Sequence, residues 1–315
     1  MTRYIIRRLL WTIPVLLFIS IITFALVHAV PGGPFDKEKA RPAEIQANLL
    51  KHYGLDQPLW KQYTDYIGIT RNPSGKYAGI LQWDFGPSIA QRSRTVNEIF
   101  SAHLPVSATL GLVALLLAVG LGVPLGIIAA LKQNSIWDYL SMAIAIVGVS
   151  VPAVVIGPLM ILVFALLLGW FPVAGWGSLR YVVLPAVTLG LGSSAIIARL
   201  TRASMLQVIR EDYIRTARAK GLSEKAIIVR HALKNAFIPV ATVLGPMFAA
   251  LVTGTFVVEQ IFAIPGMGKY FITSITNRDY PVVMGTTLLY AVFLVAANLL
   301  VDITYAFLDP RIQYE

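Results

Sequence analysis

Six stretches of this 315-residue sequence contain no charged side chain, and this pattern limits the possible folds more than any other feature. The stretches enclose 18 to 41 residues each, at 9–35, 99–131, 139–179, 181–198, 235–258 and 280–301. A helix needs roughly 20 apolar residues to cross about 30 Å of hydrocarbon. With 57% hydrophobic and 13% charged residues, the chain cannot cover a surface that faces water on all sides. The sequence therefore predicts an all-α polytopic membrane protein and excludes a soluble enzyme or a disordered chain.

The stretches predict six transmembrane helices, at about 9–30, 103–131, 138–168, 182–205, 237–262 and 283–307. The longest stretch has room for two helices, and Gly148, Pro152, Gly157 and Pro158 mark places where a helix can kink or break. The side of the membrane on which the flanking residues lie decides between one helix and two.

Basic residues indicate which helix ends face the cytoplasm. Residues 199–236 hold nine Lys or Arg against three acids, and Arg3, Arg7 and Arg8 precede the first helix. Short basic segments stay on the cytoplasmic side, so an even number of crossings must separate these two regions. We therefore expect one long, tilted or kinked helix at 138–168, six transmembrane helices in all, and cytoplasmic N- and C-termini.

The long segment between the first two helices is expected outside. Residues 31–102 hold nine basic and seven acidic residues, and loops beyond about 60 residues cross largely regardless of charge. Pro42 to Tyr53 is predicted to form a helix that Gly54 ends, and Thr95 with Glu98 forms a capping box. A cleaved signal peptide is the alternative for the first helix, but its 22-residue apolar run exceeds the usual core of about 7–15 residues.

No constellation of residues predicts catalysis or a resident metal. The chain has no Cys, and its four histidines are scattered without metal-ligand spacing. The sequence from Gly266 to Tyr270 resembles the end of a phosphate loop but lacks the required Gly at 263 and Ser or Thr at 270.

Glycines inside the apolar stretches have a structural interpretation. Gly190, Gly192 and Ala195 fit a dinucleotide fingerprint on paper, but they lie in a transmembrane run without a preceding strand. We expect them, like Gly120, Gly122 and Gly126, to let helices pack closely. Asp302 is the one acid within the last helix, and a structural role is favoured there over a functional one.

The cytoplasmic segment 206–236, called the hairpin below, is predicted to be two helices joined at a glycine. Leu206 to Lys220 is helix-compatible, with Glu211 and Arg215 as an i,i+4 pair. Gly221 supplies the left-handed residue that ends a helix, and Ser223 caps a second helix that begins with Glu224.

Two interpretations of the hairpin remain from physical reasoning alone. The small side chains of Ala217 and Ala219 beside the turn would let a partner approach closely. Alternatively, the hairpin is an ordinary basic loop held to anionic lipid.

The sequence Arg215-Thr-Ala-Arg-Ala-Lys-Gly221-Leu222, followed by Arg230-His-Ala-Leu-Lys-Asn-Ala236, resembles the ATPase-docking motif of bacterial ABC importer permeases of the dipeptide/oligopeptide branch. That motif reads Glu-Ala-Ala, three residues, Gly, nine residues, Ile-x-Leu-Pro. Departures here at Arg215, His231 and Lys234 are typical of this branch. Further likeness runs along the chain in order: 54–58, 62–63, 84–88, 122–126, 150–152, 198–204, 259–266, 279–281 and 308–311.

The resemblance implies a type I ABC importer permease fold. Its parts would be an N-terminal transmembrane helix at 1–30, an extracytoplasmic segment at 31–94, a permease core at 95–308 and a cytoplasmic tail at 309–315. The residues expected to couple to the ATPase are Arg215, Thr216, Ala217, Arg218, Gly221, Leu222, Ser223 and Glu224.

The implied function is a subunit of a binding-protein-dependent importer of peptides in the bacterial plasma (inner) membrane. Its implied partners are a second homologous permease subunit, two cytoplasmic ABC ATPases, an extracytoplasmic substrate-binding protein and membrane lipid, without nucleic acid. ATP and Mg would bind to the ATPases, with no cofactor in this chain. Alternatives are import of nickel complexes or oligosaccharides by the same machinery, an ion-coupled carrier, or a membrane enzyme.

Overall fold

The chain folds into helices that divide into two compact units. The computed structural model describes residues 2–35, 42–91, 93–253 and 255–308, with side chains from 6 to 300 except that of residue 43. Unit 1 consists of Met1–Arg8, Val106–Pro265 and Phe293–Glu315, and unit 2 of Leu9–Pro105 and Gly266–Val292. Among the described residues the only β pairing is an isolated bridge between Pro87 and Thr95.

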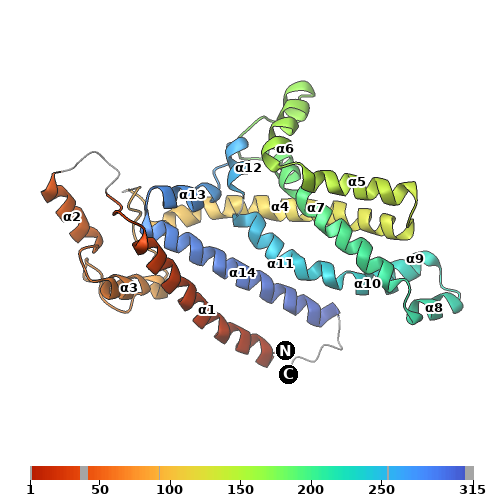
Figure 1. Cartoon of the computed structure of the whole chain (residues 1–315), viewed down its shortest axis with the longest axis horizontal. Coiled ribbons are helices and arrows are strands. Elements are labelled where there is room, and N and C mark those ends of the chain that lie inside the picture. The colour runs from red at the N-terminus through yellow and green to blue at the C-terminus, as the bar shows by residue number, and fades with distance from the viewer. Residues whose placement is uncertain (1, 36–41, 92, 254, 309–315) are drawn as a thin grey trace. The chain divides into compact units, whose positions relative to one another are not determined.

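The elements follow one another along the chain as labelled in Figure 1. They are α1 (Thr2–Ala29), α2 (Ala43–Tyr53), α3 (Leu59–Ile67), η1 (Ile80–Gln82), α4 (Val96–Leu131), α5 (Ile136–Ser150), α6 (Ala153–Met160), η2 (Ile161–Leu167), α7 (Leu179–Val208), α8 (Asp212–Ala219), α9 (Glu224–Ala226), η3 (Ile227–Ala232), α10 (Leu233–Ala236), α11 (Ile238–Thr253), α12 (Phe256–Ile261), α13 (Gly268–Thr276) and α14 (Tyr280–Leu308). η1 is a 3₁₀ helix, whereas η2 and η3 are π-helices.

Five described spans are long and apolar enough to cross a membrane, and a sixth exists if a bent pair counts as one. The five are Ile6–Ala29, Val96–Leu131, Leu179–Val208, Ile238–Ile261 and Tyr280–Leu300. They confirm five of the predicted helices to within several residues at each end.

The expected long helix at 138–168 is wrong as a single element. Two helices, Ile136–Ser150 and Ala153–Leu167, meet at a bend of 104°. Pro152 stands just before the second helix, and the preceding Val151 is extended, with φ −100° and ψ 120°. A proline lacks the N–H of an interior helical residue and disfavours the helical conformation of the residue before it. The helix therefore breaks instead of kinking.

Close helix packing in unit 1 depends on glycine. α5 lies along α7, as Figure 1 shows. α4 also approaches α7 closely at two glycines. A Cβ added to Gly122 would lie 2.6 Å from the main-chain carbonyl oxygen of Ser194, and one added to Gly126 would lie 2.6 Å from that of Ala198. These distances confirm the packing interpretation for the two glycines. It is wrong for Gly120, which faces no described atom within 4 Å.

Unit 2 has its own apolar core. It is formed by α4, α13 with the residue before it, and α14, through Val96, Ile99, Phe100, Met267, Tyr270 and Val282. The predicted capping box begins α4, because the Glu98 amide donates to Thr95 Oγ1 at 3.2 Å and the Thr95 amide donates to Glu98 Oε2 at 2.9 Å. The predicted helix before Gly54 is confirmed as α2, with Gly54 at φ +69°.

Candidate functional site

The hairpin begins with a break that the sequence did not reveal. α7 ends at Val208 and α8 begins at Asp212, so the expected continuous helix from 206 to 220 is wrong. Glu211 has an extended backbone, with φ −68° and ψ 149°, and it lies before the first turn of α8. Arg215 therefore pairs with Asp212 at 3.2 Å instead of with Glu211.

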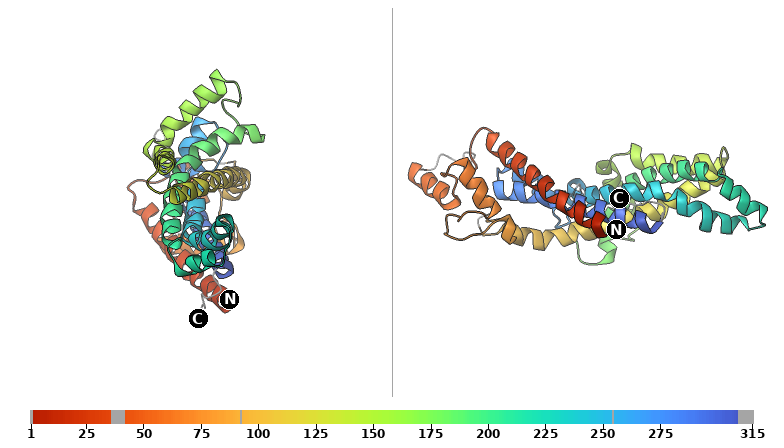
Figure 2. Two further views of the ribbon diagram at one scale, coloured as in Figure 1. Left: turned by 90° about the vertical axis from the view of Figure 1, so that its right-hand side faces the viewer. Right: turned by 90° about the horizontal axis from the view of Figure 1, so that it is seen from below.

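Inside unit 1, the hairpin packs on the ends of two long helices. The buried apolar residues of this contact come from α4, α7, α8, η3 and α10, and they are Ala130, Met205, Ile214, Ala217, Ile227, Ala232 and Ala236. Burying one large aliphatic side chain contributes about 1.5–3 kcal/mol. The hairpin is thus held to α4 and α7 by a small continuous core, and Figures 1 and 2 show it at one end of α7.

The turn between α8 and α9 is a Schellman motif centred on Gly221. The Leu222 amide donates to the Ala217 carbonyl at 3.3 Å, and the Gly221 amide donates to the Arg218 carbonyl at 2.9 Å. Gly221 has φ +76°, as predicted, and apart from its two chain neighbours no described atom lies within 4 Å of the position its Cβ would take. Leu222 is 42% exposed. The apex of the hairpin is therefore an open surface with an exposed leucine.

A polar clasp closes the turn. Ser223 Oγ accepts a hydrogen bond from the Ala226 amide at 3.4 Å, which confirms its predicted capping role. Arg218 Nε donates to Glu224 Oε1 at 2.8 Å across the turn. This hydrogen bond, together with the Arg218 positive charge, lowers the pKa of the Glu224 carboxyl and raises that of Arg218. The second helix begins at Glu224 as expected, but it continues as the π-helix η3 before α10.

The structure separates the predicted coupling residues into two groups. Seven are exposed at or near the apex, namely Arg215, Thr216, Arg218, Gly221, Leu222, Ser223 and Glu224. Ala217 is instead 6% exposed and belongs to the core of the hairpin. The expectation that its small side chain leaves room for a partner is therefore corrected, because that side chain faces the interior. Ala219 is exposed.

Charge and apolar side chains share the exposed surface of the hairpin. Basic residues outnumber acidic ones there, and Tyr213, Leu222 and Val229 are exposed large hydrophobic side chains. Such a surface can bind a protein groove that offers acidic residues around an apolar pocket.

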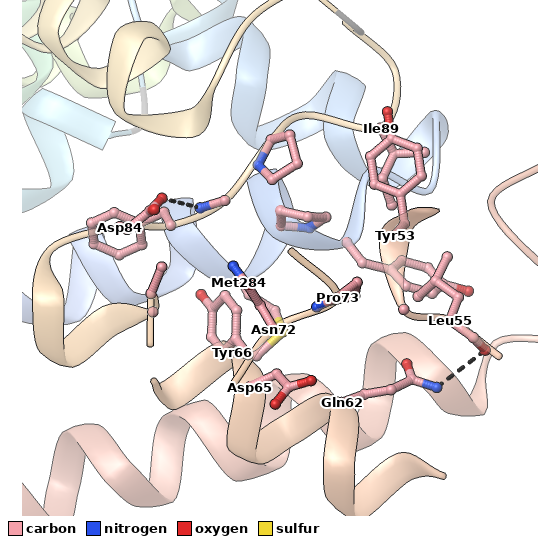
Figure 3. Close-up of a pocket in the computed structure, with 18 of the residues that line it drawn as sticks. Tyr53, Leu55, Gln62, Asp65, Tyr66, Asn72, Pro73, Asp84, Ile89 and Met284 are labelled. Atoms are coloured by element: carbon pink, nitrogen blue, oxygen red, sulfur yellow. Dashed lines mark hydrogen bonds between the residues drawn. The ribbon is translucent and has the colours of Figure 1, made fainter. Parts of the chain in front are cut away.

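Unit 2 contains a cavity of about 210 Å³ (Figure 3). Aromatic and polar side chains of α1, α2, α3, α14 and the loop before α4 line it, among them His28, His52, Tyr53, Asp65, Tyr66, Asp84 and Tyr280. Asp65 is already bound by Lys61 and Thr70, at 2.5 Å each. The Tyr66 hydroxyl is buried without a partner among the described atoms. Its burial is the main cause that raises its pKa, and electrostatic repulsion from the neighbouring Tyr63 adds to the increase.

The chemistry of this cavity is limited. Its size suits a few water molecules or one small organic group. Although two histidines line it, no three His, Cys, Asp or Glu residues in the described part of the chain gather as a metal site.

Three buried acids form polar contacts that sequence reasoning did not single out. Asp138 is paired with Arg202, and Glu259 accepts hydrogen bonds from Ser107 and Thr255, at 2.5 Å each. Asp279 accepts from Ser88 and from the amides of residues 89 and 90. Each acid borders a long uncharged stretch, which was the available signal. The side chain of Asp302, which was singled out, lies outside the described residues.

Comparisons with known proteins agree on one family. The profile described as "Binding-protein-dependent transport system inner membrane component" matches residues 122–314, and its N-terminal companion matches residues 1–111. The dipeptide transport system permease protein DppB of Bacillus subtilis is 48% identical over 99% of this chain and 98% of its own length. The oligopeptide transport system permease protein OppB of Salmonella typhimurium is 44% identical over the full length of both.

Solved structures extend the likeness to the fold. The MetNI methionine ABC transporter, in inward-facing conformations, gives a TM-score of 0.54 at 19% identity, over 67% of this chain and 96% of the other. An amino acid ABC transporter gives 0.51 at 17% identity, over 66% and 93%. At these identities the likeness concerns the fold.

Proposed function

The chain belongs to the family of binding-protein-dependent transport system inner membrane components, and we propose that it forms half of a path for peptides delivered by an extracytoplasmic binding protein. It is a transmembrane permease subunit of an ABC importer, located in the inner membrane. The peptide cargo is inferred from relatives named as dipeptide and oligopeptide permeases. A second homologous permease subunit would line the other half of the path.

The open apex of the hairpin is the observation that supports docking of an ATPase. Gly221 adopts a conformation that favours glycine, and only its two chain neighbours lie within 4 Å of the position its Cβ would take, among the described residues. Leu222 beside it is exposed although it is apolar. A partner surface that covers Leu222 would bury apolar area, and the absence of a Cβ at 221 would let that surface approach the backbone.

The energy source would lie in two cytoplasmic ATPase subunits, which bind ATP and magnesium. Closure of the ATPase pair would displace the hairpin. Because the hairpin shares its core with the ends of α4 and α7, the displacement would tilt these helices. Transport then follows if ATP stabilises one of two arrangements of the path more than the other.

This mechanism requires the hairpin and both termini in the cytoplasm and residues 31–94 outside. The basic excess of 199–236 supports that orientation. In this arrangement the extracytoplasmic segment would receive the binding protein, and the apolar outer faces of the spans would contact lipid.

A Leu222→Asp variant tests the proposal, with Leu81→Asp, the same change at an exposed leucine of unit 2, as the control for docking. The purified permease pair is used to pull down the ATPase subunits, and reconstituted vesicles are assayed for ATP-dependent uptake of a labelled dipeptide. We expect Leu222→Asp to lose both docking and uptake, because it places a charge in an apolar contact. Normal docking by this variant would contradict the docking role.

Two further results would contradict other parts of the proposal. Uptake of nickel complexes or oligosaccharides instead of peptides would contradict the peptide cargo, and nucleotide binding by the isolated chain would contradict the assignment of ATP to the partner ATPases.

A further inference from the structure

A partly buried ion pair joins α5 to α7 near the hairpin. Asp138 is 3% exposed, in the first turn of α5. Arg202 donates to both of its carboxylate oxygens, from Nε and from Nη2, at 2.7 Å each. Two parallel charge-assisted hydrogen bonds fix direction as well as distance. This contact is therefore geometrically specific, and its carboxylate is shielded from water, unlike those of the exposed ion pairs of the hairpin.

The other described contacts between α5 and α7 are apolar, and most of the buried ones involve small residues, with Met142 packed beside them. Ala145 packs against Ala195 and Ala198, and Gly148 lies against the backbone of Leu191. Such contacts bring the helices close but are individually weak and non-directional, whereas a paired hydrogen bond fixes one position on each helix against the other. In the described part of the chain, the Asp138–Arg202 pair supplies the only side-chain hydrogen bonds between these two helices.

The same pair lies one helical turn from the core of the hairpin. Met205, one turn after Arg202 on α7, is fully buried in that core, together with Ala130 at the end of α4. The loop between α4 and α5 is tied to the pair as well, because the Asn134 amide donates to Asp138 Oδ2 at 3.0 Å. The ends of α4, α5 and α7 are thereby fastened together beside the hairpin.

α5 runs from the ion pair to the bend at Val151, and α6 follows the bend. There α6 packs against α12, where a Cβ at Gly157 would lie 3.2 Å from Ile261. A displacement at the start of α5 is therefore carried to a second packed region of unit 1. We propose that Asp138 and Arg202 are positioning residues that fix α5 to the hairpin end of α7, so that hairpin movement reaches the broken helix of α5 and α6. This inference rests on the proposed docking function of the hairpin.

Asp138→Asn tests the proposal, because it keeps the side-chain volume and removes the charge. The complex of both permeases with their ATPases is reconstituted, and peptide uptake is measured with ATP hydrolysis in the same vesicles. We expect ATPase docking to persist, hydrolysis to change less than about twofold, and uptake per ATP to fall roughly tenfold. Asp56→Asn makes the same chemical change at an exposed residue of unit 2, and it should leave the ratio unchanged. A proportional fall of uptake and hydrolysis in Asp138→Asn would overturn the proposal, since it would indicate a general structural loss.

A chemical cross-link between residues 138 and 202 distinguishes a positioning role of the pair from a contribution to stability alone. The chain has no cysteine, so the double variant Asp138→Cys with Arg202→Cys provides two unique thiols. A short bifunctional maleimide should restore most of the lost uptake per ATP, whereas a monofunctional maleimide should not. Equal results with both reagents would overturn the proposal. If the double variant does not assemble, Arg202→Lys, which keeps the charge but not the paired geometry, should give an intermediate ratio, and an unchanged ratio would count against it.

A measurement independent of cargo keeps this inference distinct from the proposed function. Spin labels at Ile146 and Lys225, both exposed, report the distance between α5 and the hairpin. We expect the distance to stay nearly constant on ATP binding to the intact complex and to change in Asp138→Asn. The same response in both proteins would overturn the positioning role, whatever the transported molecule is.

Discussion

Two turns in this chain have the same local structure and opposite surroundings. α2 and α8 both end in a Schellman motif, with Gly54 at φ +69° and Gly221 at φ +76°. At Gly54 an added Cβ would lie 2.8 Å from Pro73 Cγ, whereas Gly221 faces open space. Gly54 is needed both for its backbone conformation and for its packing. Gly221 is needed by its own chain only for the conformation, so the free space beside it is available to a partner.

The largest expected difference between the two turns is their side of the membrane. A cysteine at Ser74, in the segment that follows Gly54, should react with an impermeant maleimide in intact cells or spheroplasts. A cysteine at Ser223, beside Gly221, should react only after permeabilisation, because a basic excess favours the cytoplasmic side. The measurement is gel-shift labelling of each single-cysteine variant, and the reverse pattern would place the hairpin outside and remove its proposed partner.

Substitution of Gly54 or Gly221 by asparagine tests the effect of an added side chain with little change in backbone conformation, because asparagine tolerates the left-handed region. Gly221→Asn should leave the hairpin folded and weaken ATPase pull-down at least about tenfold, since its side chain occupies the space that a partner needs. Gly54→Asn should leave docking unchanged and destabilise unit 2 by about 1–3 kcal/mol through overpacking against Pro73. Thermal unfolding and pull-down are measured for both.

Gly221→Val sharpens this test, because valine adds about 1 kcal/mol or more of backbone strain at positive φ. It should abolish uptake while the membrane spans remain inserted. Normal docking and uptake with either substitution at 221 would contradict the coupling role of the hairpin.

Two alanines of α8 extend the comparison from the turn to the helix before it. Ala217→Asp buries an unpaired charge in the core of the hairpin and should destabilise it by about 2–4 kcal/mol. Ala219→Asp lies on the exposed surface and should leave the hairpin folded. Limited proteolysis of the hairpin should therefore accelerate only in the first variant, and equal protection of both would contradict the described burial of Ala217.

The smallest effect is expected from the clasp between Arg218 and Glu224. The pKa of the Glu224 carboxyl is lowered, so its stabilising contribution is present above the ordinary carboxyl pKa and is lost as pH falls through the lowered value. Both side chains are largely exposed, so solvent screens the pair. Glu224→Gln should therefore slightly increase the rate of hairpin proteolysis at neutral pH, and that rate should no longer rise as the pH is lowered. If the rate in Glu224→Gln still rises at low pH, the pH dependence belongs to another group.

The sequence by itself determined the membrane class, the approximate spans and both glycine turns. The reason is that these features are local: an uncharged apolar run, a glycine after a helical segment, or a capping pair such as Thr95 and Glu98 requires no distant residue. The family motifs around Gly221 also identified the hairpin before its geometry was known.

The tertiary structure decided which side chains meet. In the folded chain Ala217 is buried, and Arg215 forms an ion pair with Asp212 and not with Glu211. The predicted helix at 138–168 is two helices that meet at an angle of 104° before Pro152. The tertiary structure also paired Asp138 with Arg202 across a separation of 64 residues. No local pattern specifies such a pair, because the free energy of burying a charge depends on the partner that the fold brings within hydrogen-bonding distance.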